Sequence, residues 1–430
     1  MAPAPVRKVA FPFAAQDLGW FAGAMRLRSW TGVSRRVGAL AIALVVAHPL
    51  PAPAAAAWAL VPGAPLTDAG QNYLDGVSCA TGSGTARATA TCFAVGSLIT
   101  ETGTTRPLIE RWNGRGWSVV PSPARSHTIA SALVAVSCAT RKSCMAVGNS
   151  RADTTSPTVP LIEHWNGSRW SVVPSPAPRG STGTYLNAVS CTSAKVCIAV
   201  GNYTSSFTSG SALVARWNGT KWMLMNAPNP GRAAVTQLLG VSCTGAGPAL
   251  TCWAVGQYAL AASGTPYLTA TVRLAHGKWS VVPSPIHGDH NSQLMSVSCT
   301  SAKSCFAAGS WERGYGASLI EHWNGKRWTI VNSANPRGFT FSQLSGISCS
   351  SARSCVATGT YAIGSAPGAT LIEQWNGTKW LLQPGADPPK AMNSALTGVS
   401  CVEATRCLAV GTYLTHKFGN PAAGYSQHRS

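Results

Sequence analysis

The chain has 430 residues, of which 45% are hydrophobic and only 11% are charged, and its formal net charge at pH 7 is +20. A positive excess of this size favours anionic partners, although it would also keep an extracellular protein soluble. Because no recognition motif and no basic run accompanies the charge, the sequence argues against nucleic-acid binding.

Residues 1–57 are expected to be an N-terminal extension and a secretory signal peptide, with Met25 as the natural start. Basic residues between Arg26 and Arg36 precede an apolar run from Val37 to Ala47, and an alanine-rich stretch ends at Ala57. That order of basic region, short apolar core and small residues is typical of a secretory signal. The apolar run is too short to span a bilayer, so we expect a secreted protein with no membrane span in the mature chain.

After this leader, one pattern of residues recurs seven times. A full copy contains V-S-C, then C-x-A-V-G, then I-E-x-W-N-G-x-x-W, then a proline-rich step, with some departures, and the last copy has only the first two of these parts. The first cysteines of the copies are Cys79, Cys138, Cys191, Cys243, Cys299, Cys349 and Cys401, so the period is 50 to 59 residues. A period of this size built from short strands indicates a β-propeller or a related array, because one unit cannot bury both of its faces alone.

The chain has 14 cysteines, two in each copy. The predicted pairs are Cys79 with Cys92, Cys138 with Cys144, Cys191 with Cys197, Cys243 with Cys252, Cys299 with Cys305, Cys349 with Cys355, and Cys401 with Cys407. A hairpin brings the two sulfurs of each pair together, which favours seven local disulfides and an extracellular location. Zinc is the alternative, but no copy has the tighter ligand spacing of a zinc site, and we expect no cofactor.

Each copy can be divided into four strands. In the second copy they are Leu133 to Cys138, Cys144 to Gly148, Leu161 to Trp165 and the strand after Trp170. The Asn-Gly pair between the third and fourth strands is a strong hairpin signal, because both residues tolerate positive φ. Proline after the fourth strand ends the pairing.

The two ends of the repeat region suggest how a ring would close. Residues 58–62 look like a fourth strand with nothing before it, whereas the last copy contains only its first two strands. We therefore predict an all-β, seven-bladed β-propeller of four-stranded blades over residues 58–414, with one disulfide per blade and the ring closed by the N-terminal strand. Six blades plus a partial seventh is the alternative. Residues 415–430 lack I-E-x-W-N-G and are expected to form an irregular C-terminal tail.

In these motifs the chain resembles secreted β-propeller-like repeat proteins of actinobacteria, whose function is largely uncharacterised, and it is loosely similar to kelch-type propellers without their paired glycines. The resemblance covers residues 58–414. It implies the fold and export, and it carries over no catalytic residue.

Eleven of the 16 tryptophans lie in the hairpin between the third and fourth strands. Because the pair recurs in nearly every copy, we interpret them as packing residues rather than as a sugar platform. A catalytic pair needs two carboxylates aimed at one point, whereas the repeated Glu110, Glu163, Glu321 and Glu373 would be spread around a ring. We therefore expect them to pair with a repeated basic or backbone group.

Function is expected where the copies differ, in the turns between strands two and three and in the segments between copies, because binding residues often lie in varied loops on a rigid scaffold. The candidate ligand-binding residues are Tyr203, Phe207, Tyr258, Tyr267, Trp311, Glu312, Arg313, Tyr315, Arg337 and Phe339. His287, Asp289 and His290 are a weak candidate for a metal or proton-relay site, and a polar surface loop is the default interpretation.

We therefore hypothesise a monomeric, secreted binding module for an anionic polysaccharide, a cell-wall polymer or an extracellular protein. The alternative is an extracellular polysaccharide hydrolase or lyase with a site at the mouth of the ring. Acidic residues are scarce in the varied loops, which favours binding over catalysis.

Overall fold

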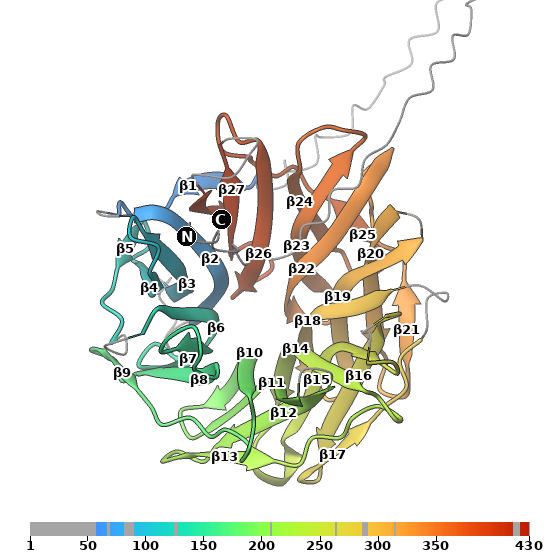
Figure 1. The fold of residues 1–430 in the computed structure, drawn as a ribbon. Helices are drawn as coiled ribbons and strands as arrows, with labels where there is room; N and C mark the ends of the chain where they lie inside the picture. Colours follow the sequence, from blue (N-terminus) through green and yellow to red (C-terminus); the bar gives the residue numbers. More distant parts are fainter. Residues whose placement is uncertain are drawn as a thin grey trace, which may run out of the picture. The chain divides into compact units, whose positions relative to one another are not determined.

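The computed structural model describes most of the chain from residue 57 onward (Figure 1). The described residues are 57–66, 69–80, 90–123, 128–206, 209–262, 265–285, 291–313, 315–415 and 422–429. All of them belong to one compact unit, Ala54–Ser430, which is separate from Met1–Pro53. The predicted signal peptide and the start at Met25 lie outside the described residues. No helix long and apolar enough to cross a membrane occurs within these ranges.

Within these ranges the chain is all-β, with 28 strands and one short 3-10 helix. The strands form seven four-stranded antiparallel units, and a single parallel pairing joins the first unit to the second and the third to the fourth. Units 1 to 3 contain β2 (Ala69–Ala80), β3 (Thr91–Thr100), β4 (Thr105–Trp112) and β5 (Trp117–Val119); β6 (Ala130–Thr140), β7 (Ser143–Arg151), β8 (Val159–Trp165) and β9 (Trp170–Val172); and β10 (Gly183–Ser193), β11 (Val196–Ser206), β12 (Ser209–Trp217) and β13 (Trp222–Met225).

Units 4 to 6 follow the same plan. They contain β14 (Val235–Thr244), η1 (Gly247–Ala249), β15 (Thr251–Ala259), β16 (Leu268–Ala275) and β17 (Lys278–Val281); β18 (Ser292–Ser301), β19 (Ser304–Arg313), β20 (Tyr315–Trp323) and β21 (Trp328–Val331); and β22 (Phe339–Ser351), β23 (Ser354–Ile363), β24 (Ala369–Trp375) and β25 (Trp380–Leu382). The strand order within each copy is thus the one that the sequence predicts.

Unit 7 is assembled from both ends of the described chain. Its strand order is β26 (Asn393–Cys401), β27 (Cys407–Leu414), β28 (Ala422–Arg429) and β1 (Ala59–Pro62). The N-terminal strand therefore pairs as predicted, but the expectation of an irregular tail is wrong for 422–429. This segment takes the place of the third strand because its backbone pairs with β27 in the register of the other units, although its side chains depart from I-E-x-W.

The C-x-A-V-G motif of the second strand always ends in glycine, in the form A-x-G, and a β-bulge in every first strand explains this glycine. The pairing of strands one and two shifts register directly after a buried leucine in all seven units, for example between Leu186 and Ala188. The bulge pushes a first-strand carbonyl against strand two, so that a Cβ added to Gly201 would lie 1.9 Å from the oxygen of Tyr185. The six equivalent glycines meet the same obstacle at 1.9 to 2.0 Å. Only glycine fits there.

The serine of V-S-C joins each unit to the next. In each case the serine Oγ accepts a hydrogen bond of 2.9 to 3.0 Å from the backbone N–H of the first cysteine in the following unit. The seventh bond closes the series, because Ser400 accepts from Cys79. The first strands of the seven units accordingly follow one another around the middle of the compact unit Ala54–Ser430 (Figure 1). In order they are β2, β6, β10, β14, β18, β22 and β26.

The hydrophobic core lies between neighbouring units and contains the paired tryptophans. Phe93 of unit 1, for example, contacts Trp165 and Trp170 of unit 2 with ring centroids 5.1 Å apart in both cases. The cluster that contains Trp112 and Trp117 of unit 1 includes side chains of unit 7, so the packing also closes on itself. The tryptophans at these positions are buried or half-buried, in agreement with the packing interpretation.

Candidate functional site

Each unit has two chemically different ends. One end holds the disulfide turn and the Asn-Gly turn, since Cys144 pairs with Trp165 and Trp165 pairs with Trp170. We call the surface made of these ends the disulfide face. The other end holds the turns between strands two and three and the links between units, and we call it the link face. All seven predicted disulfides are present.

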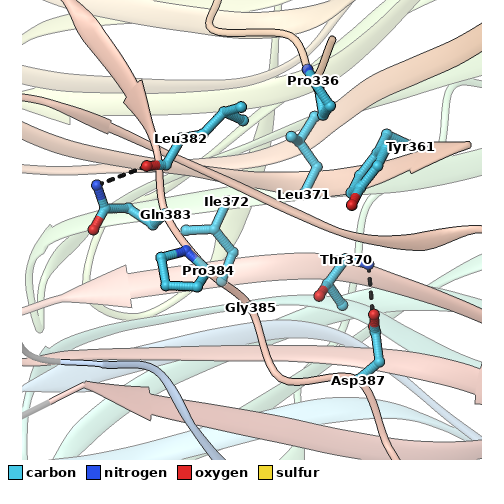
Figure 2. A pocket seen from close by; sticks show the side chains of 10 residues that line it. All are labelled: Pro336, Tyr361, Thr370, Leu371, Ile372, Leu382, Gln383, Pro384, Gly385 and Asp387. Atoms are coloured by element: carbon cyan, nitrogen blue, oxygen red, sulfur yellow. Dashed lines mark hydrogen bonds between the residues drawn. The ribbon is translucent and has the colours of Figure 1, made fainter. Parts of the chain in front are cut away.

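A pocket of about 430 Å³ opens at the link-face end of unit 6 (Figure 2). Strand β23 contributes Tyr361, strand β24 contributes Thr370 to Ile372, and the chain before β26 contributes Leu382 to Gly385 and Asp387. Pro336, from the preceding link, completes the pocket from 51 residues away from Asp387. The pocket therefore exists only because two successive links meet over the ends of one unit.

Polar groups of the pocket are held by its own backbone. Asp387 Oδ1 accepts a hydrogen bond of 3.1 Å from the Thr370 backbone N–H, which orients the carboxylate at the pocket edge (Figure 2). The hydroxyl of Thr370 is buried and has no hydrogen-bond partner among the described residues. A Cβ at Gly385 would lie 2.5 Å from that hydroxyl, so glycine is what the close approach of the link requires. Buried hydroxyls are normally paired, and this one departs from that rule.

Unit 7 supports the pocket from behind. The Ala386 backbone N–H donates a hydrogen bond of 3.0 Å to Oε1 of Gln427 on β28. Burial and then the nearby charge of Asp387 raise the pKa of Tyr425. The tyrosine hydroxyl, which is buried, is therefore held neutral beside the link. The segment that carries Asp387 is thus fixed by the strand that closes unit 7.

The repeated glutamates anchor the links. Glu163, which is fully buried, accepts a hydrogen bond of 2.7 Å from Ser122 in the link before its unit. Glu321 accepts from Ser284, and Glu373 accepts from Ser333 and from the Ala334 N–H. Burial raises the pKa of Glu163 to about 7 and that of Glu321 to about 8. Their partners are serine hydroxyls and backbone groups rather than the basic groups that the sequence left open.

The structure brings only some of the predicted binding residues together. Asn291 Oδ1 accepts a hydrogen bond of 2.8 Å from the Tyr267 N–H, and its Nδ2 donates one of 2.8 Å to Glu312. These three residues join the loops of units 4 and 5 into one polar cluster. Glu312 is exposed, whereas the adjacent Trp311 is half-buried.

Several of the candidates share one position, two residues after the A-x-G glycine on strand two. This position is aromatic in five units, as Tyr203, Tyr258, Trp311, Tyr361 and Tyr413, and all five side chains are half-buried near the link face. In each of the five units it pairs with a buried serine or threonine on strand one, for example Thr236 opposite Tyr258. We call it the aromatic position. Only Tyr361 lines the pocket of Figure 2.

The other candidates are scattered or not described. Phe339 is half-buried at the start of β22, and Arg337 is exposed in the preceding turn. The backbones of Arg313 and Tyr315 pair across the turn between β19 and β20. Phe207 and the weak metal candidates His287, Asp289 and His290 lie outside the described residues. Within the described ranges, no group of three or more His, Cys, Asp or Glu could hold a metal ion.

Sequence reasoning missed Thr370, Tyr361 and Asp387. A signal was present, because the link after unit 6 reads Pro384-Gly385-Ala386-Asp387, which departs from Pro-Ser-Pro and carries an acidic residue. What it could not reveal is that Pro336 of the previous link would lie over the same strands.

No family model and no curated protein sequence matches the chain. Among solved structures, YCF48 bound to D1 peptide is 12% identical, with 89% of this chain and 100% of that chain covered and a TM-score of 0.50. A polysaccharide lyase of family PL25, an ulvan lyase bound to -[GlcA(1-4)Rha3S]-, is 10% identical, with 85% and 97% covered and a TM-score of 0.49. The six-bladed β-propeller lectin of Aleuria aurantia, which recognises fucose, is 14% identical, with 75% and 99% covered and a TM-score of 0.40. Structures similar to this chain thus include β-propellers, a lectin and a polysaccharide lyase, and at such identity the likeness concerns the fold alone.

Proposed function

We propose that this protein is a secreted, seven-bladed β-propeller binding module, stabilised by one disulfide per blade, that docks an extracellular polymer or protein on its link face. The observation that carries the proposal is the pocket at Tyr361 and Asp387, which lies on the face where the copies differ. Seven local disulfides are typical of proteins in oxidising, extracellular compartments, which supports secretion.

Two features support seven blades over six blades and a fragment. The seventh unit has four strands within the described residues, and its third strand carries Gln427 where units 1, 2, 5 and 6 carry glutamate. The series of serine-to-cysteine hydrogen bonds also passes through this unit without interruption. A fragment that merely covered one edge would not need these contacts.

The chemistry of the pocket narrows the ligand. Its lining combines one aromatic ring, two prolines and aliphatic side chains with Thr370 and Gln383, and its charged side chain is the carboxylate of Asp387. An aromatic ring beside a few fixed polar groups can orient a small ligand. Of the proposed partners, this favours an uncharged sugar of a wall polymer or a segment of a protein over an anionic glycan, which would face Asp387.

The alternative is a polysaccharide hydrolase or lyase. A hydrolase needs two carboxylates that flank the scissile bond. The ten lining residues provide one, Asp387, and its hydrogen bond to the Thr370 N–H fits a positioning role in binding. We therefore retain binding as the proposal.

Binding of the oxidised full-length chain to purified cell-wall polysaccharide and to a panel of neutral and anionic glycans tests this proposal. We expect retention on at least one uncharged glycan, with the affinity reduced at least tenfold by Tyr361→Ala and by Asp387→Asn. Tyr258→Ala is the matched control, because it removes the aromatic ring from the same position of unit 4, outside the pocket. Equal losses for Tyr361→Ala and Tyr258→Ala would contradict a role for the pocket, and hydrolysis or elimination products would favour the enzyme.

A further inference from the structure

The disulfide face carries exposed cations at the same two turns of most units. Within the described residues the cations at these turns are Arg115, Arg141, Lys142, Arg169, Lys195, Lys221, Lys278, Lys303, Lys326, Arg327, Arg353 and Lys379, all of them exposed, together with the half-buried Arg406. The disulfide and Asn-Gly motifs of this face repeat from unit to unit. The charges repeat with the motifs.

The two turns of a unit lie against each other, which pairs their cations. The stem of Lys142 passes over the Asn-Gly turn, where a Cβ at Gly167 would lie 3.2 Å from the Cβ of Lys142. Lys195 lies over Gly219 and Lys303 over Gly325 in the same way, at 3.3 and 3.2 Å. These glycines have φ between 92° and 101°, so both the turn and the lysine stem require glycine there.

Each Asn-Gly turn then adds its own cation beside that stem. The Asn166 Oδ1 accepts hydrogen bonds of 3.0 Å from the N–H groups of Ser168 and Arg169, which fixes the turn. Asn218 holds the N–H of Lys221 in the same way. Units 2, 3, 5 and 6 therefore each present a disulfide-turn cation next to an Asn-Gly-turn cation.

Acidic residues do not balance this charge. Within the described part of the chain, the acid at these turns is Glu403, and it forms its ion pair of 3.2 Å with Arg406. The described link face, by contrast, has six cations with a described side chain, at 106, 151, 179, 232, 337 and 390, against four acids, at 101, 153, 312 and 387. A surface of one sign repels itself, and it attracts ligands of the opposite sign from solution.

The composition of the disulfide face also indicates what kind of polyanion fits. The exposed large hydrophobic side chains of the described chain lie on fourth strands, such as Leu224, or toward the link face, such as Phe341. A lipid surface is normally held by apolar groups as well as by charge. Single-stranded nucleic acid is held by stacking on aromatic rings, and the tryptophans next to these turns are largely buried.

We infer that the disulfide face is a second binding surface, which docks a linear anionic glycan through its carboxylate or sulfate groups. A polymer with a regular spacing of charges matches cations that recur from unit to unit. Because the surface lies at the opposite end of every unit from the pocket, either binding activity can fail without the other.

Binding of the oxidised full-length chain to polygalacturonate, which carries carboxylates, and to dextran sulfate, measured from low to high salt, tests this inference. The disulfide-face variant is K195Q/K221Q/K303Q/K379Q, and the matched control R179Q/R232Q/R337Q/K390Q removes the same number of charges from the link face. We expect the first variant to weaken binding at least tenfold and to lower the slope of log K against log salt by about 3, if each contact contributes as on a single-stranded polyanion. We expect the control to bind within about twofold of the wild type.

Equal losses for the two variants would overturn the inference, because binding would then follow net charge alone. Tighter binding to duplex DNA or to anionic vesicles than to either glycan at the same salt would also overturn it, as would no retention on either glycan. Thermal unfolding checks that both variants fold, and R115Q/R169Q/K278Q provides a second disulfide-face variant on other units. Neutral dextran is the blank for the polymer backbone.

Discussion

The side-chain oxygen of Ser400 accepts a hydrogen bond of 3.0 Å from the backbone N–H of Cys79, although 321 residues separate them in the chain. The same bond joins each of the six remaining pairs of successive units, across 51 to 60 residues. The contact between the last and the first unit is therefore chemically the same as the contacts within the series.

Replacing one serine of this series tests what it contributes. We expect Ser242→Ala to lower the free energy of unfolding by about 1 kcal/mol, because it leaves the Cys299 N–H without its partner. Ser400→Ala should cost a similar amount if unit 7 closes on unit 1 in the same way. Denaturant unfolding of the oxidised protein measures both, with the exposed Ser118→Ala as control. A Ser400→Ala variant as stable as the wild type would contradict closure.

The glycine of A-x-G is expected to be indispensable. Gly201→Ala places a Cβ where the Tyr185 carbonyl oxygen lies 1.9 Å away, so strand one must move and lose its bulge geometry. We expect a loss of at least about 3 kcal/mol, as for overpacked sites, or failure to fold. Gly116→Ala is the control, since nothing lies within 4 Å of its Cβ position. Similar thermal stability of the two variants would show that the bulge is not needed.

The N-terminal strand should contribute as much as an internal one. Trp58, directly before β1, is 5% exposed and packs with Tyr425, Val356 and Leu396. We expect Trp58→Ala to cost about 3 to 5 kcal/mol, comparable to Trp170→Ala in unit 2. If unit 7 were only a loosely attached fragment, thermal unfolding would show a large shift for Trp170→Ala and almost none for Trp58→Ala.

The buried glutamates make stability depend on pH. The folded-state pKa of Glu163 is raised by burial from its ordinary 4.5 to about 7, so between these values the folded state binds more protons than the unfolded state. Its contribution is therefore fully present below pH 4.5, decreases as the pH rises toward 7 and is constant above that, for a total of up to about 3 kcal/mol.

Glu163→Gln should remove this dependence. At pH 5 the amide resembles the protonated carboxyl, so we expect little change, whereas at pH 8 the variant should be more stable than the wild type. Gln427 shows that the fold accommodates glutamine at this position in unit 7. Comparing variant and wild type at both pH values cancels the opposite contribution of half-buried histidines such as His164, whose pKa burial lowers. A variant with the same stability difference at pH 5 and pH 8 would contradict the assignment, and Glu403→Gln is the exposed control.

The local elements of each unit were predictable from the sequence. Cysteines that lie six positions apart, as Cys299 and Cys305 do, need only a hairpin to meet. The Asn-Gly turn and the alternation of its flanking strands are likewise set by neighbours in the chain. The packing of the paired tryptophans followed from their regular recurrence. For these features the interacting residues are close in sequence, so the local sequence pattern is enough to predict the contact.

Contacts between units were decided by the tertiary structure alone. β28 pairs with β27 through backbone groups, which leave no signature in Ala422–Arg429. The pocket needs Pro336 and Asp387 from different links, and the basic surface appears only when turns from successive units point the same way. Each of these depends on how units stack rather than on how a hairpin folds. The sequence therefore determined the repeating unit, and the packing of one unit on the next decided where ligands can bind.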